Sequence, residues 1–362
     1  MTGMSAPGHD LSSGLDRGLT RGVVVTVVGA KGAPGATTSM LALASGWPRP
    51  VLVVDADLAG GDVAAGWLAG RVGLDRGLLS FAAATRHADR ATPADLGPHV
   101  VTVPDAPGVM VLPGLAHAGQ AGGLDNRLWG RLVTAATSPW PTGDPAADSP
   151  VDSTNRPAAS GGGSGRRGSA GFCGSRAEAG AGPARVDVLA DCGRVGAGTP
   201  WPLLAAASVV LLATRSTLRG VHHARHALAH VEAALPGILG DPGRVGLLVC
   251  GPGVYDPREV GRAVGLPVRA VLPGDGRAAD MLTDHTGTAG RRGAGPGRTA
   301  LARTVLARAA RTAAVELAGA AEDVAAAGEE PSGVGPEGDG AGWGGSARVS
   351  AGSASTGQGG WR

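Results

Sequence analysis

The sequence predicts an α/β protein built on a single doubly wound, mostly parallel sheet. Two observations predict this fold. Short apolar runs rich in valine and leucine alternate with longer segments of helical periodicity, and uninterrupted apolar strands are typical of parallel sheets covered by helices on both faces. The first run, residues 23–30, leads through a glycine-rich loop into an apolar helix. This order of elements is typical of a phosphate-binding βα unit.

The first half of the fold follows from this alternation. The valine- and leucine-rich runs are expected to be strands, and the alanine-rich or amphipathic segments between them are expected to be helices. In chain order we expect strand 23–30, helix 36–46, strand 51–55, helix 62–69, a short helix at 77–84, strand 109–112 and helix 124–136.

A change in composition then interrupts the pattern. Residues 138–184 are rich in glycine, serine, proline and aspartate, and such a segment buries too little apolar surface to order itself. Beyond it we expect strands at 186–190, 208–213, 245–249 and 268–272, and helices at 217–235, 256–264 and 299–320. The predicted organisation is one domain formed by residues 21–137 and 185–321, a disordered insertion at 138–184, and disordered ends at 1–20 and 322–362.

The composition narrows the class of protein. The net charge of +2 over 362 residues is too close to balance to indicate a nucleic-acid partner or an anionic membrane. The three cysteines show no paired spacing, which predicts a reducing compartment without disulfides. The sequence shows neither a leader segment nor an apolar run of about 18 residues. We therefore expect a cytoplasmic protein without an integral membrane segment, which partners could still recruit to a membrane surface.

The glycine-rich loop contains the only lysine of the chain, Lys31. A standard phosphate loop has glycine, four residues, glycine, lysine and then serine or threonine. Gly35 and Thr37 fit this pattern, but Ala36 stands where the lysine is expected. Pro34 has no backbone N–H to donate. Loss of the ammonium alone removes a charge-assisted hydrogen bond, so phosphate affinity should fall about 10- to 150-fold.

Residues 31–38, KGAPGATT, resemble the deviant Walker A motif of the ParA/MinD family, Lys-Gly-Gly-x-Gly-Lys-Thr-Thr. The resemblance implies a P-loop NTPase fold of the SIMIBI type that binds ATP with Mg²⁺ and forms a face-to-face homodimer. In that family the first lysine reaches across the dimer to the partner's phosphates. Lys31 matches this lysine, while Ala36 departs from the second one. The positions that match the cofactor-binding motif are Lys31, Gly32, Gly35, Ala36, Thr37 and Thr38.

Two further segments carry the resemblance. Residues 51–57, VLVVDAD, are similar to the family's second-strand motif, in which the second aspartate, here Asp57, orients the attacking water. Residues 186–193, VDVLADCG, resemble a Walker B strand whose aspartate, here Asp191, holds Mg²⁺ through water. The resemblance thus implies Thr37, Asp55 and Asp191 as metal ligands, and Lys31 and Asp57 as catalytic residues. Judged from the strand alone, Asp55 and Asp57 could instead cap the following helix.

Within the family, the CpaE-like branch and actinobacterial septum site-determining homologues look most similar. Residues 58–64 resemble the Leu…Gly-Asp-Val-Ala of that branch, which often carries alanine in place of the loop lysine. We therefore expect a degenerate CpaE- or MinD-like protein that binds ATP weakly or conditionally. It would act on cell-division proteins in septum placement, or on pilus or secretion proteins during assembly.

The expected enzymatic activity is at most that of a weak ATPase, because Ala36 replaces the Walker A lysine. Two alternatives remain open at this point. One is an active ParA/MinD-type ATPase in cell division or chromosome partitioning, and the other is a structural pseudo-ATPase that binds no nucleotide.

Two other clusters are weaker candidates. His222, His226 and His230 repeat at helical spacing and could hold a metal, but no cysteine or carboxylate completes a ligand set nearby. Arginines of the last predicted helix could contact DNA phosphates. The apolar residues that recur along this helix favour a helix packed on the sheet, with its arginines facing water. The arginines are Arg303, Arg308 and Arg311, and the apolar residues are Leu301, Val305, Leu306 and Val315.

Overall fold

The computed structural model describes residues 21–31, 35–68, 70, 72–73, 75–103, 106–141, 184–283 and 301–327. All of them belong to one compact unit that ends at Glu329. The segments predicted to be disordered, at 1–20, 138–184 and 322–362, lie wholly or largely outside the described residues. Their disorder therefore stays a prediction.

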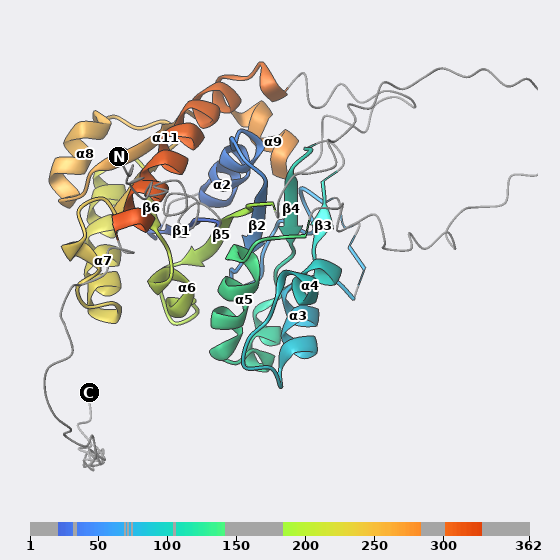
Figure 1. Cartoon of the computed structure of the whole chain (residues 1–362). Helices are drawn as coiled ribbons and strands as arrows, with labels where there is room; N and C mark the ends of the chain where they lie inside the picture. Colours follow the sequence, from blue (N-terminus) through green and yellow to red (C-terminus); the bar gives the residue numbers. More distant parts are fainter. Residues whose placement is uncertain are drawn as a thin grey trace, which may run out of the picture. The chain divides into compact units, whose positions relative to one another are not determined.

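An eight-stranded sheet forms the centre of the described unit, in the order β3-β4-β2-β5-β1-β6-β7-β8 (Figure 1). Neighbouring strands are parallel except for β3 and β4. The strands are β1 (Val24–Gly29), β2 (Val51–Asp55), β3 (Val101–Thr102), β4 (Val109–Leu112), β5 (Asp187–Arg194), β6 (Val209–Thr214), β7 (Val245–Cys250) and β8 (Val268–Leu272). Because strands are added on both sides of β1, the predicted doubly wound sheet is confirmed.

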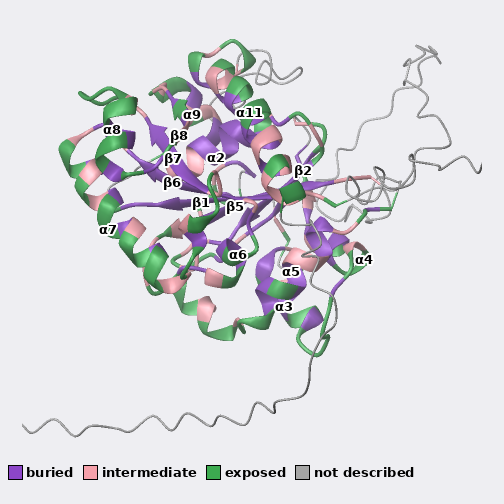
Figure 2. Ribbon diagram, turned by 60° about the vertical axis from the view of Figure 1, so that its left-hand side comes forward, coloured by how far each residue is buried: buried purple, intermediate pink, exposed green. Residues whose placement is uncertain are grey.

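Helices cover both faces of this sheet, and the buried residues lie between the helices and the strands (Figure 2). One face carries α2 (Ala36–Ser45), α9 (Gly276–Thr283) and α11 (Val305–Ala327). The other carries α3 (Leu78–Thr85), α4 (Pro93–Leu96), α5 (Arg127–Thr137), α6 (Trp201–Ala205), α7 (Leu218–Ala234) and α8 (Pro257–Val264). Short 3-10 turns are η1 (Gly97–His99), η2 (Ala118–Gly123) and η4 (Ile238–Gly240). None of the helices among the described residues is long and apolar enough to cross a membrane.

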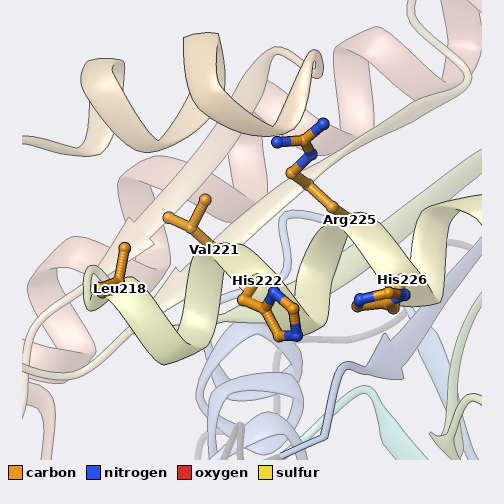
Figure 3. Close-up of a pocket in the computed structure, with 5 residues that line it drawn as sticks. All are labelled: Leu218, Val221, His222, Arg225 and His226. Carbon is orange, nitrogen blue, oxygen red and sulfur yellow. The ribbon is translucent and has the colours of Figure 1, made fainter.

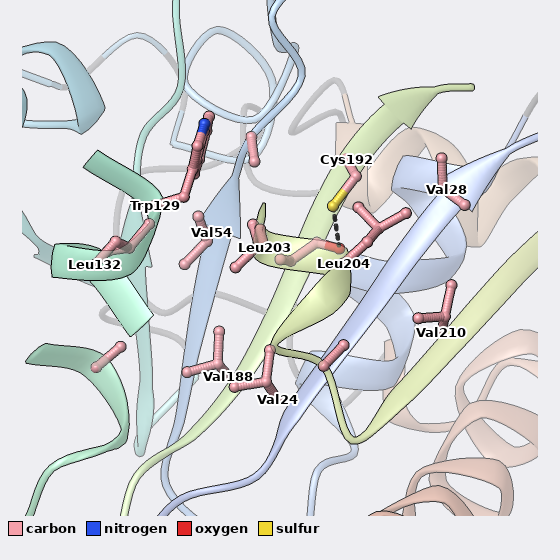
Figure 4. Packing of buried hydrophobic residues seen from close by; sticks show 14 of the residues in the cluster. Val24, Val28, Val54, Trp129, Leu132, Val188, Cys192, Leu203, Leu204 and Val210 are labelled. Carbon is pink, nitrogen blue, oxygen red and sulfur yellow. Dashed lines mark hydrogen bonds between the residues drawn. The ribbon is translucent and has the colours of Figure 1, made fainter. Parts of the chain in front are cut away.

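The central strand shows why an uninterrupted apolar run is needed. Val24 and Val28 of β1 pack in the layer that contains α5 and α6, whereas Val25 and Val27 pack in the layer that contains α2 and α11. Figure 4 shows part of the first layer, where Trp129 and its neighbours lie beside β2 and β5. Replacing a large side chain in such a layer by a small one costs about 2–5 kcal/mol in the free energy of unfolding. Because both layers are closely packed, they fix the positions of the strand ends.

The helix predicted at 62–69 is wrong. Its described part, residues 62–68, forms consecutive turns. Gly60 before it has a φ of +114°, and the Gly66 backbone lies so close to α9 that an added Cβ would be 1.9 Å from the Thr283 carbonyl oxygen. The segment is therefore shaped by a tertiary contact that periodicity does not reveal. Among the described elements, β3, α4, α6 and α9 were not predicted, because runs this short carry little periodicity.

The last helix packs on the sheet, but through other residues than expected. It begins at Val305, and it ends at Ala327, beyond the predicted domain boundary at 321. Its buried face consists of two leucines and five alanines, namely Leu306, Ala310, Ala313, Ala314, Leu317, Ala318 and Ala321. The predicted core positions Val305 and Val315 are instead each 54% exposed. The arginines of its predicted solvent-facing side are all exposed: Arg303, Arg308 and Arg311.

Candidate functional site

The sequence-predicted site residues come from the carboxyl ends of three neighbouring strands, β1, β2 and β5. Open parallel sheets bind ligands in the crevice outside these ends. Strand β1 continues through Lys31 into the loop before α2. At the end of that loop Gly35 caps the helix with a φ of +99°, in the left-handed region that favours glycine. Gly32, which is also assigned to the site, lies outside the described residues.

The N-terminus of α2 lies at this edge of the sheet. The first amides of an α-helix have no partner within the helix, and the helix dipole adds partial positive charge there. The first turn of α2 contains no acidic side chain. Ala36 faces the end of β1, because a Cβ added to Gly29 would lie 3.9 Å from the Ala36 Cβ. Thr38, in the same turn, is half-buried. The turn therefore offers amide donors without a neighbouring negative charge on its own helix.

The structure brings Thr37 and Asp191 together. The Thr37 side chain lies close enough to the Asp191 carboxyl to lower its pKa, and the backbone N–H of Gly193 donates a hydrogen bond to Oδ1 of Asp191 at 3.0 Å. Asp191 is 2% exposed. Burial raises the pKa of its carboxyl above the ordinary value, although Thr37 and the Gly193 amide act in the opposite direction. A hydroxyl from α2 and a carboxylate from β5 therefore meet at the edge of the sheet.

Asp55 lies beside Asp191, because the two residues are register partners on the adjacent strands β2 and β5. Two glycines leave room for its carboxylate. A Cβ added to Gly61 would lie 1.9 Å from Oδ2 of Asp55, and a Cβ added to Gly114 would lie 2.6 Å from Cγ of Asp55. The Asp57 amide donates to Oδ1 at 3.4 Å, whereas Oδ2 has no hydrogen bond of normal geometry within the described residues. The carboxylate is thus enclosed but only partly satisfied.

The two buried carboxyls repel each other. Burial, the largest influence, raises the pKa of Asp55 to about 7, and the Asp191 charge beside it acts in the same direction. The backbone amides of Asp57 and Val63 lower this pKa but do not compensate for the burial. Two carboxylates in one buried site do not both ionise at low cost unless a positive charge is supplied. The site is therefore short of a cation.

The donors at this point fit Mg²⁺. This ion takes hard oxygen ligands such as carboxylates, and it usually keeps several waters. Asp55, Asp191 and Thr37 bring carboxylate and hydroxyl oxygens to one place, and the unpartnered Oδ2 of Asp55 is a buried atom that a cation would satisfy. A bound Mg²⁺ would supply charge for phosphate oxygens and would keep both carboxylates ionised.

Asp57 lies at the rim of the site, two residues after Asp55. Its Oδ1 accepts a hydrogen bond from the Ala59 amide at 2.8 Å. Its carboxylate packs over Gly193, where an added Cβ would lie 2.4 Å from the Asp57 Cγ. Together with Arg194 and the chain that follows it, Asp57 lines a cavity of about 320 Å³. Asp57 therefore contacts a space large enough for several water molecules, unlike the enclosed Asp55.

Lys31 is exposed, and no ion pair joins it to a described acidic side chain. It lies near α7. Desolvation, the adjacent His222 and then Lys31 lower the pKa of His223. The charge of Lys31 is not among the main influences on Asp55 or Asp191. Within the described residues, Lys31 thus makes no ion pair with the acidic pair, and its charge acts on His223 of α7.

Sequence reasoning assigned no role to several residues that shape this site. Gly61 and Gly114 enclose the Asp55 carboxylate, and Gly193 lies under Asp57 with a φ of +63°. Arg194 ends β5 and shares the cavity with Asp57. A signal was present for two of them, because Gly193 and Arg194 lie at the end of the Walker B-like strand, just after Asp191. No comparable pattern marks Gly114, which comes from the chain after β4.

A separate cavity of about 390 Å³ lies on α7 (Figure 3). It is lined by Leu218, Val221, His222, Arg225 and His226. The rings of His222 and His226 lie 4.5 Å apart, edge to face, whereas His230 stacks on Trp201. Nowhere in the described part of the chain do three or more histidine, cysteine, aspartate or glutamate side chains form a group that could hold a metal. The histidine repeat of α7 is thus divided between two different contacts.

Comparison with known proteins gives matches in structure only. No protein-family model matches the chain, and no curated protein matches it in sequence. A ParA family ATPase from Chlorobium tepidum TLS superposes with a TM-score of 0.54 at 14% identity, over 82% of this chain and 99% of that chain. The septum site-determining protein MinD of Pyrococcus horikoshii OT3, complexed with Mg-ADP, superposes with a TM-score of 0.50 at 15% identity, over 82% and 95%.

A third similar structure is a chain of the MinC:MinD cell division protein complex from Aquifex aeolicus. Its TM-score is 0.50 at 13% identity, over 82% of this chain and 96% of that chain. Identities this low concern the fold, and the superpositions include nearly the whole of each compared chain. The chain has the fold of the ParA/MinD-type P-loop ATPases.

Proposed function

We propose that this chain is a nucleotide-binding protein of the CpaE- or MinD-like type. It binds ATP with Mg²⁺ weakly or conditionally, and it acts mainly by localising partner proteins. The observation that supports this most directly is the meeting of Thr37, Asp191 and Asp55 beside the N-terminus of α2. Hard oxygen donors next to free helix amides are what a magnesium-nucleotide complex requires.

Each predicted residue has a role in this proposal. Backbone amides of the first turn of α2, including those of Ala36 and Thr38, donate to phosphate oxygens. The Thr37 hydroxyl, Asp191 and Asp55 hold Mg²⁺, which supplies charge neutralisation when bound. Asp57, at the rim of its cavity, holds a water molecule in place.

Lys31 belongs to a second part of the proposal. Because it is exposed and makes no ion pair with a described acidic side chain, it is free to contact the phosphates bound by a second copy of the chain. Two copies facing each other across their nucleotides would each lend one lysine. This arrangement makes nucleotide binding and dimerisation depend on each other.

Hydrolysis is expected to be slow or absent. Phosphoryl transfer depends on positioning and on positive charge around the transferred group, and Ala36 offers no ammonium there. Nucleotide binding, which also uses backbone amides and Mg²⁺, is less sensitive to this loss. A protein with these properties would work through the presence or absence of bound ATP rather than through rapid turnover.

The test is calorimetric titration of the full chain with ATP and Mg²⁺. We expect measurable binding that Asp191→Asn weakens at least about 10-fold, because a charged metal ligand is lost. Asp280→Asn, an exposed change of equal charge on α9, is the matched control and should bind like the unchanged chain. No heat with the unchanged chain would contradict the proposal and favour the nucleotide-free alternative.

The active ATPase is the second alternative, and a phosphate-release assay separates it from the proposal. Turnover near about 1 per minute, on the scale of slow intrinsic GTPases, that disappears in Asp57→Ala would favour the enzyme. Neighbouring genes test the cellular setting. Pilin and secretion-ATPase genes would support the pilus or secretion role, cell-division genes would support septum placement, and a centromere-binding gene would support partitioning.

A further inference from the structure

The loop of this chain contains no arginine, but an arginine lies beside its base. Strand β1 has β5 on one side and β6 on the other. Gly29, near the start of the loop, is the register partner of Arg194 at the end of β5. The next amide of that strand, from Val195, donates to the Gly29 carbonyl at 3.1 Å. The backbone of Arg194 is therefore held against the strand end from which the phosphate loop begins.

The side chain of Arg194 is uncommitted. It is exposed, and within the described residues it makes no ion pair, although it lines the same cavity as Asp57. The left-handed turn at Gly193 brings Arg194 directly after the point where Asp57 packs. A cation thus lines the cavity that contains Asp57, and no ion pair joins it to an acidic group among the described residues.

We infer that Arg194 supplies the positive charge that Ala36 lacks. It would reach the terminal phosphates of the nucleotide from the neighbouring strand of the same chain. This inference rests on the proposed nucleotide binding. A guanidinium suits the role, because its planar donors bind phosphate oxygens in pairs and it stays charged at all relevant pH values. Arg194 is in this view a phosphate-binding residue.

The other candidate cations are placed less well. The charge of Lys31 acts on His223 of α7. Arg215 follows β6, on the opposite side of β1 from Arg194, but its guanidinium lies near Gly251 and acts on the pKa of Cys250, both at the end of β7. Neither lines the cavity that contains Asp57. Arg194 is therefore the described cation that shares a space with the predicted water-holding aspartate.

A double-mutant cycle tests the inference. The affinity of the full chain for ATP with Mg²⁺ is measured by calorimetry in the unchanged protein, Arg194→Gln, Ala36→Lys and the double variant. We expect Arg194→Gln to weaken binding about 10- to 150-fold, the effect of one charge-assisted hydrogen bond. Ala36→Lys should tighten binding and make the loss on removing Arg194 several-fold smaller, because the two cations serve the same phosphates.

Controls separate a binding role from a structural one. Arg308→Gln removes an equal charge from the exposed face of α11 and should leave affinity unchanged. Thermal unfolding without nucleotide should be the same for Arg194→Gln and the unchanged chain, because the side chain is exposed and unpaired. Arg194→Lys should retain part of the affinity, since it keeps the charge but not the paired donors.

The outcomes distinguish this inference from the proposed function. If the unchanged chain binds no nucleotide, the proposed function fails and the inference fails with it. If the unchanged chain binds but Arg194→Gln binds equally well, only the inference is overturned. An equal fold loss with alanine and with lysine at position 36 would also overturn it, because Arg194 would then act independently of the missing ammonium.

Discussion

The two ends of strand β5 carry buried aspartates in opposite electrostatic situations. Asp187 begins the strand at 0% exposure, and Asp191 lies near its other end at 2% exposure. At Asp187 both carboxylate oxygens accept hydrogen bonds, and two arginines lie beside them. At Asp191 the nearest charges are other carboxylates, and burial raises the pKa. We call the end of β5 at Asp187 the saturated end, because its carboxylate is fully hydrogen-bonded and ion-paired. We call the end at Asp191 the unsaturated end, because its carboxylate lacks such compensation.

The saturated end holds the fold together. The Val23 amide donates to Oδ1 of Asp187 at 3.1 Å, and the Trp47 indole donates to Oδ2 at 2.9 Å. Arg49 and Arg185 approach the two oxygens at 2.6 Å and 3.3 Å. These partners come from before β1, from the chain after α2 and from before β5. Because both oxygens of this buried carboxylate already accept hydrogen bonds from several donors, they are not available to bind a ligand.

The unsaturated end retains the capacity to bind a ligand. Asp55 and Asp191 lie side by side, and Oδ2 of Asp55 has no hydrogen-bond partner among the described residues, which costs stability in the folded chain without ligand. A structural role would favour filling such a site with donors, as at Asp187. Burial of an acid is therefore not itself a mark of function, whereas burial without compensating donors or charges is. Four substitutions test this contrast between Asp187 and the pair formed by Asp55 and Asp191.

Asp187→Asn should have the largest effect. Removing the charge leaves Arg49 and Arg185 without their buried partner and the Trp47 indole with a poorer acceptor. We expect a loss of about 3–5 kcal/mol in the free energy of unfolding, as for other broken buried pairs. Urea unfolding measures it. At temperatures where the variant stays folded, nucleotide affinity should be unchanged, and a loss below about 1 kcal/mol would contradict the structural role.

Asp55→Asn should stabilise the chain in the absence of ligand. The folded-state pKa of about 7 exceeds the ordinary value of 3.8, so between these pH values the folded chain holds a proton that the unfolded chain has released. The free energy of unfolding therefore falls as pH rises through this range. A rise in pKa of this size corresponds to about 4 kcal/mol of unfolding free energy at most. We expect the free energy of unfolding of the variant to exceed that of the unchanged chain by about 2 kcal/mol at pH 8 and by little at pH 4.

The difference between the unchanged chain and Asp55→Asn reports on Asp55 and its coupled neighbour Asp191 and removes the contributions of distant groups. His99 and His223 have lowered pKa values, so they make stability rise with pH, but they act equally in both proteins. Unfolding free energies measured from pH 4 to 8 should therefore diverge in one direction. Parallel curves would show that Asp55 is not a strained acid, and the contrast with Asp187 would be lost.

Gly61→Ala tests the enclosure of Asp55. Its Cβ would lie 1.9 Å from Oδ2 of Asp55, and Gly114 blocks the other side of the carboxylate. We expect a loss of about 1–2 kcal/mol in stability from overpacking and weaker binding of ATP with Mg²⁺. Gly130→Ala, in α5 with open space around it, is the matched control and should gain about 0.5–1 kcal/mol. Equal behaviour of the two variants would show that the carboxylate has room to move.

The sequence was sufficient for most of the fold, because strands β2, β4 and β8 are apolar runs whose bounds the pattern alone predicts. It failed at 62–68, where the contact of Gly66 with the Thr283 carbonyl determines the conformation. For the site, motifs identified Thr37 and Asp191. The place of Arg194 beside Gly29 depends on β5 pairing with β1, and strand order is not readable from local periodicity.

Glu322→Gln should have the smallest effect. Glu322 of α11 lies 3.1 Å from Arg49 and 2.7 Å from Arg185, at 36% exposure. Solvent screens such pairs, so we expect a loss below about 1 kcal/mol that shrinks further in high salt. Glu316→Gln, exposed on the same helix, controls for the change in charge. A loss as large as that of Asp187→Asn would contradict this expectation. It would mean that the amino end of β5 is stabilised by the partly exposed ion pairs of Glu322 rather than by the buried carboxylate of Asp187.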